Sequence, residues 1–101
     1  ETAYYYFTRQ IEENAVYLLD EPENSLSATL QNKLRQFIED SARFYGCQFI
    51  IASHSPVFLS IPGAKIYDLD SKPVCERKWT ELPNVRMFFD FFMEHKAEFE
   101  E

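Results

Sequence analysis

The chain has 101 residues, a length that suits one small domain. Its net charge of −7 predicts a surface that repels phosphate backbones, so the chain by itself is a poor candidate for sequence-independent nucleic-acid binding. No apolar run approaches the roughly 18 residues of a membrane span, and the N-terminus lacks the basic start of a signal peptide. We therefore expect neither membrane insertion nor secretion.

Two details of the composition bear on where the chain comes from. The first residue is Glu1 rather than Met, so we expect a piece of a longer or processed protein. Cys47 and Cys75 are the only cysteines, and nothing else suggests a secreted disulfide scaffold. Free thiols in a reducing, cytoplasmic compartment are therefore favoured over a disulfide.

A helix is the first element that the sequence predicts. Tyr4, Phe7 and Ile11 recur at helical spacing, which predicts a helix over residues 1–14. A short apolar run follows it.

This run, Val16 to Leu19, is continuous, as in a strand that is buried on both faces of a parallel sheet. Pro22 cannot continue a strand ladder. The strand is therefore predicted to end at two adjacent acids, Asp20 and Glu21.

A second helix is predicted after these acids. Ser25 or Ser27 can cap its N-terminus, and Gly46 supplies its C-terminal stop. Apolar side chains at steps of three and four residues predict its buried face: Leu30, Leu34, Phe37, Ile38 and Ala42.

The stretch "CQFIIAS" then predicts a second buried strand, which ends at His54. A strand, a helix and a second strand with a crossover of this length form a βαβ unit, which builds a parallel sheet. The predicted fold class is therefore α/β, with parallel strands and flanking helices.

The remaining residues predict smaller elements. Pro56 opens a helical turn, "KIYDLD" suits a third strand, and "VCERKW" suits a short return strand. From Asn84 onward a C-terminal helix is predicted, with one face made by Val85, Phe88, Phe89, Phe92 and Phe99. We expect residues 1–101 to form a single domain, in which residues 15–69 are the core and residues 70–101 are a C-terminal turn and helix.

Polar side chains follow both predicted strands. Asp20 and Glu21 end the first strand, and Ser53 and His54 end the second. Because ligands of open α/β sheets sit beyond the carboxyl ends of the strands, we expect these groups to converge as neighbours or one strand apart.

These residue types suit nucleotide hydrolysis. A strand-end carboxylate such as Asp20 can hold Mg²⁺, which prefers hard oxygen ligands. Glu21 can orient or deprotonate an attacking water, and His54 can donate a hydrogen bond to a phosphate that gains charge.

Three stretches resemble motifs of ABC-type ATPases. "VYLLDEP" is similar to the Walker B strand, "ENSLS" to the D-loop and "FIIASHSP" to the switch-histidine loop. The similarity is strongest over residues 15–69 and points to the RecF/SMC-like and bacterial AAA family ATPase groups. Transporter subunits are less similar, because their D-loop usually ends in Leu-Asp, whereas this chain has Leu26 and Ser27.

The resemblance implies ATP as substrate, with Mg²⁺ as its cofactor, and a role for each matched residue. Asp20 would hold Mg²⁺ through water, Glu21 would be the catalytic base, and His54 would sense the γ-phosphate. A homodimer across the nucleotide is implied as well. The D-loop residues that would meet the partner subunit are Asn24, Ser25, Leu26 and Ser27.

One part of an ATPase site is missing from the sequence. No Gly-x-x-x-x-Gly-Lys-Ser/Thr phosphate loop occurs, and the only glycines are Gly46 and Gly63. The resemblance therefore implies the C-terminal part of a P-loop ATPase head, with Glu1 near its signature loop and an N-terminal portion elsewhere. We expect this part alone to be inactive, and nucleic-acid binding only in the full protein.

Less specific interpretations stay open. Adjacent acids are often solvated loop residues, and a lone histidine is more often structural than catalytic. Ser53 and Ser55 suit loop and capping roles, because no nucleophile elbow is present. The alternative function is a non-catalytic interaction or assembly domain derived from such an ATPase. A coupled task in DNA repair or anti-phage defence rests on family analogy.

Overall fold

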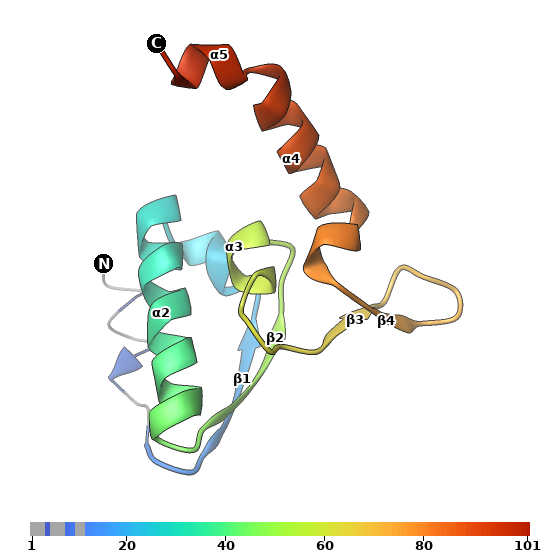
Figure 1. The fold of residues 1–101 in the computed structure, drawn as a ribbon. Helices are drawn as coiled ribbons and strands as arrows, with labels where there is room; N and C mark the ends of the chain where they lie inside the picture. The colour runs from blue at the N-terminus through green and yellow to red at the C-terminus, as the bar shows by residue number, and fades with distance from the viewer. Residues whose placement is uncertain (1–3, 5–7, 10–11) are drawn as a thin grey trace. The chain divides into compact units, whose positions relative to one another are not determined.

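The computed structural model describes residues 4, 8–9 and 12–101, and the chain divides into two compact units, residues 1–62 and 63–101 (Figure 1). The predicted N-terminal helix falls mostly on residues outside the described ones. Among the described residues, no helix has both the length and the apolar character needed to cross a membrane. The elements of the first unit are β1 (Val16–Asp20), η1 (Pro22–Ser25), α2 (Ala28–Phe44), β2 (Gln48–Ala52) and α3 (Pro56–Leu59).

The strands β1 and β2 are parallel and directly hydrogen-bonded neighbours, with α2 as the crossover between them (Figure 1). Their register pairs Val16 with Gln48 at one end and Asp20 with Ala52 at the other. Both strands therefore end level with each other. The prediction of a parallel βαβ unit is confirmed, and of the two strand orders left open the adjacent one is correct.

A small core holds this unit together. Leu26, Leu34, Ile38 and Phe58 are buried in one cluster, which joins η1, α2 and α3. The inner face of the sheet packs against the same cluster through Leu19, Phe49 and Ile51. Burial of such side chains is the main favourable contribution to the stability of a unit of this size.

Within the described part of the chain, the sheet is covered on one face, which differs from the predicted two-sided burial. Tyr17 and Leu19 are partly buried on the α2 side, whereas Val16 and Leu18 on the other face are 60% and 75% exposed. Ile50 of β2 is 55% exposed on the same outer face. A continuous apolar run indicates that both faces can be covered, but it cannot show whether a covering element is present.

Both predicted ends of α2 are confirmed. The Oγ of Ser27 accepts a hydrogen bond from the backbone N–H of Leu30, so Ser27 rather than Ser25 is the N-cap. After the last helical residue, Gly46 takes a left-handed conformation with φ of 66°, which ends the helix at little steric cost.

One residue of the predicted α2 face is wrong. Ala42 is exposed, and Ser41 is buried in its place, with 2% of its surface accessible. The buried residues Leu34, Ile38 and Ser41 follow steps of four and three, which keeps them on one side of the helix. The apolar character of Ala42 misled the prediction, because the helical period places position 41 rather than position 42 on the buried side.

The second unit contains β3 (Ile66–Asp68), β4 (Cys75–Arg77), η2 (Trp79–Glu81), α4 (Pro83–Glu94) and α5 (Lys96–Phe99). The two strands pair antiparallel as a separate hairpin. An ion pair of 3.0 Å between Arg77 Nε and Asp68 Oδ2 joins the two strands. The predicted third and return strands both exist, and they form their own sheet.

The predicted C-terminal helix is divided into α4 and α5 at His95, whose φ of −102° and ψ of 12° are not helical. Val85 is the buried residue of α4. The large apolar side chains of these two helices are substantially exposed: Met87, Phe88, Phe89, Phe91, Phe92, Met93 and Phe99.

Candidate functional site

The site is built where β1 and β2 end. The N–H of Glu21 donates to the carbonyl of Ala52 at 2.7 Å, which extends the strand pairing by one residue. Glu21 itself is left-handed, with φ of 45° and ψ of 55°, and Pro22 opens the one-turn helix η1 directly after it. The chain therefore turns sharply at Glu21 and brings the next side chains over the end of β2.

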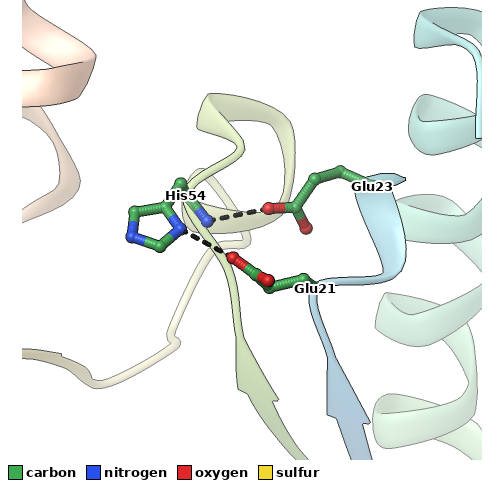
Figure 2. A group of neighbouring side chains, drawn as sticks. All are labelled: Glu21, Glu23 and His54. Atoms are coloured by element: carbon green, nitrogen blue, oxygen red, sulfur yellow. Dashed lines mark hydrogen bonds and ion pairs between the residues drawn. The ribbon is translucent and has the colours of Figure 1, made fainter. Parts of the chain in front are cut away.

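Glu21 and His54 meet across the two strand ends. The Nδ1 atom of His54 lies 3.1 Å from Oε1 of Glu21. Figure 2 shows the imidazole and the carboxylate turned toward each other. The side chain of His54 is 74% exposed and that of Glu21 is 42% exposed, so this is a surface pair. Such pairs contribute about 0–1 kcal/mol, so their own attraction holds the geometry only weakly. The amide of Asn24 also approaches Glu21 Oε2, at 3.5 Å.

Glu23 makes a second bridge between the strand ends. One carboxylate oxygen accepts from the hydroxyl of Ser53 at 2.8 Å. The other accepts from the backbone N–H of His54 at 2.9 Å, a hydrogen bond that is drawn in Figure 2. The sequence prediction missed this residue. The only signal was a third acid two positions after Glu21, and its partners become apparent only from the strand register.

Gln31 of α2 makes a third bridge, which was also missed. Its Oε1 accepts from the hydroxyl of Ser55 at 2.7 Å, and its Nε2 donates to the carbonyl of Leu26 at 3.2 Å. The Oγ of Ser55 caps α3 by accepting from the N–H of Val57, which agrees with the expected capping role. Together, Glu21, Glu23, Gln31, Ser53, His54 and Ser55 are called the strand-tip network below.

Asp20 stands apart from this network. By the alternation of β1 it lies on the same face as Leu18, the exposed face, and the residue is exposed. Within residues 4, 8–9 and 12–101, its carboxylate makes no hydrogen bond or ion pair. A strand-end carboxylate with unoccupied oxygens fits Mg²⁺, which is commonly held by one or two carboxylates and several waters.

A different group could also hold a cation. One ligand atom each of Glu21, Glu23 and His54 lies within 4.8 Å of the others. Asp20 does not belong to this group. The strand ends therefore carry three carboxylates, and none of the side chains in the strand-tip network is a lysine or arginine. Such a rim attracts cations and repels free triphosphate.

The predicted D-loop residues have different environments. Asn24, Ser25 and Ser27 are exposed, whereas Leu26 is buried in the core with 8% of its surface accessible. Asn24 and Ser25 are thus the residues of this loop that are best placed to contact another chain.

Comparison with known proteins identifies one family. The sequence model of the family described as "AAA domain, putative AbiEii toxin, Type IV TA system" matches residues 3–60. This range is more than half of the chain and contains the whole strand-tip network and Asp20. Searches of curated proteins and of solved structures found no match.

Proposed function

The chain belongs to this family of AAA domains, a family of nucleotide-binding, ATPase-like domains, and we propose that it supplies the metal-binding and water-activating half of an ABC-type ATP hydrolase. Its parallel two-stranded sheet and crossover helix are compatible with part of a P-loop NTPase fold. Within that half, β1 is the Walker B strand and the segment around His54 is the switch-histidine loop.

The observation that carries the proposal is the contact of Glu21 with His54 at the level ends of two parallel strands. Glu21 takes the proton of the attacking water, and His54 donates a hydrogen bond to the γ-phosphate as its charge grows. Asp20 would hold Mg²⁺, and the ion would supply charge neutralisation for the phosphates.

The acidic strand ends supply no cationic group for the triphosphate, so the proposal requires a phosphate loop from outside these 101 residues. That loop belongs to an N-terminal ATPase portion, and the nucleotide lies between two copies in a homodimer. Asn24 and Ser25 contact the second copy, because they are exposed and, unlike Ser27, do not cap α2.

The test uses the full-length protein. Glu21→Gln keeps the shape of the side chain but removes the base, so kcat should fall at least about 100-fold while ATP binding persists. Glu13→Gln is the matched control, because Glu13 is an exposed turn residue before the start of β1, at the opposite end of that strand from Glu21. Steady-state hydrolysis and nucleotide retention are the measurements. Unchanged turnover in Glu21→Gln would show that Glu21 is not the base.

A second candidate is a non-catalytic assembly domain. The absence of a phosphate loop from the printed sequence favours it. The coding sequence upstream of Glu1 separates the two candidates. A phosphate loop in the same reading frame supports the hydrolase, whereas a start codon near Glu1 supports the assembly domain.

A further inference from the structure

We propose that Glu23 is a positioning residue, which fixes the backbone of His54 so that the imidazole is held beside Glu21. The inference rests on the proposed function for its catalytic consequence, but its geometric part stands by itself. It assigns a role to a carboxylate to which the proposed function gives none.

The first step is the weakness of the Glu21–His54 contact. Both side chains are substantially exposed, and the imidazole is 74% accessible to solvent. An exposed pair is screened by water and does not fix two side chains in one arrangement. The backbone that carries the ring therefore contributes to where the ring can lie.

The second step is the quality of the contacts that Glu23 makes. Each of its oxygens accepts one hydrogen bond, from Ser53 Oγ at 2.8 Å and from His54 N–H at 2.9 Å. Hydrogen bonds to an ionised acceptor are shorter and stronger than neutral ones. Ser53 Oγ in turn accepts from the N–H of Ser55 at 3.0 Å. Glu23 therefore holds the chain at His54 directly, and on either side of it through the hydroxyl of Ser53.

The third step is the position of Glu23 in the chain. It lies in the single turn η1, directly between Glu21 and the exposed residues Asn24 and Ser25. Pro22 at the start of this turn is fully buried, which anchors η1 to the core. A partner that displaced Asn24 or Ser25 would move Glu23 and, through it, the backbone of His54.

The contacts that Glu23 makes can be removed without loss of the fold. Gln31 independently links Ser55 to Leu26, so the two strand ends stay connected when Glu23 is removed. Glu23 is not part of the buried core cluster. We therefore expect Glu23→Ala to fold, with its effect confined to the segment around His54.

The geometric test uses the 101-residue chain and measures amide hydrogen exchange by NMR. In Glu23→Ala the His54 amide should exchange about tenfold faster, because the loss of one hydrogen bond favours opening. Glu23→Gln should largely restore the wild-type rate, because its carbonyl oxygen still accepts from that N–H. Glu13→Gln should change nothing. An unaltered His54 exchange rate in Glu23→Ala would overturn the proposal.

The catalytic test uses the full-length protein. Glu23→Ala should lower kcat about 10- to 100-fold with little change in the KM for ATP, because misplaced groups slow chemistry more than binding. Glu23→Gln should be intermediate. A wild-type rate in Glu23→Ala would overturn the positioning role. If the wild-type protein hydrolysed no ATP, the proposed function would fail, and the exchange measurement would still decide whether Glu23 holds His54.

Discussion

At Glu21 the backbone is left-handed, with φ of 45°, although the residue carries a Cβ atom. This conformation costs an L-residue about 1–2 kcal/mol. It also turns the chain so that its carboxylate faces His54 and leaves that of Asp20 on the outer face of β1. Strained backbone at such a position is consistent with a role in function rather than in stability.

Two substitutions at Glu21 measure this strain directly. Glu21→Ala and Glu21→Gly both remove the carboxylate and its contact with His54, so they differ only in backbone preference. At an ordinary position Ala is more stable than Gly by about 0.5–1 kcal/mol. Here the order should be inverted, with Gly more stable by about 1 kcal/mol, because Gly adopts positive φ without a steric penalty.

Urea unfolding of the two variants gives the difference in free energy. An Ala variant as stable as the Gly variant, or more stable, would mean that Glu21 is not left-handed in solution. The wild-type protein serves as the reference for the carboxylate itself.

At the scale of elements, the N-cap of α2 is the feature with the clearest energetic consequence. Ser27→Ala removes the acceptor for the N–H of Leu30 and should destabilise the chain by about 1 kcal/mol. Ser25→Ala is the matched control and should change the free energy of unfolding by less than about 0.5 kcal/mol, because Ser25 is exposed and does not cap α2. Equal losses in both variants, measured by urea unfolding, would contradict the assignment of the cap.

These elements also show which features a sequence can predict. Residues with one strong local preference, such as Ser27 before α2 and Gly46 after it, fixed the ends of the helix correctly. The parallel direction of β1 and β2 followed from the length of the crossover, whereas their direct pairing was left open. Glu23 and Gln31 could not be found in this way, because the residues after β2 that they contact lie at least 24 positions away along the chain and depend on the strand register.

The predicted site also contains features that the sequence predicts and features that it does not. The sequence predicted that Glu21 and His54 would lie together, since both directly follow parallel strands. It did not predict that Asp20 and Glu21 would separate, because this depends on the positive φ of Glu21. It also treated the D-loop as one contact surface, whereas the structure buries Leu26 in the core.

For the whole molecule, the strand ends and the outer sheet face lead to separate expectations. The strand ends are acidic and provide no phosphate-binding cation in the strand-tip network. The outer face exposes the large apolar side chains of Val16, Leu18 and Ile50, and each of the two strands has a single hydrogen-bonded neighbour among the described residues. Parallel sheets are normally covered on both faces, and unpaired strand edges promote association.

We therefore expect the 101-residue chain to self-associate through the outer face of β1 and β2. Leu18→Lys places a charge at the centre of this face, where Leu18 is 75% exposed, and should shift the chain toward monomer. Leu69→Lys is the matched control, because Leu69 is 76% exposed but lies outside both sheets. Sedimentation velocity over a range of concentrations measures the association. A charge that is buried in a contact between sheets is far more costly than a charge on an isolated exposed side chain, so Leu18→Lys should weaken the association more than Leu69→Lys does. If the two variants associated equally strongly, another apolar surface, such as the exposed phenylalanines of α4, would drive the association.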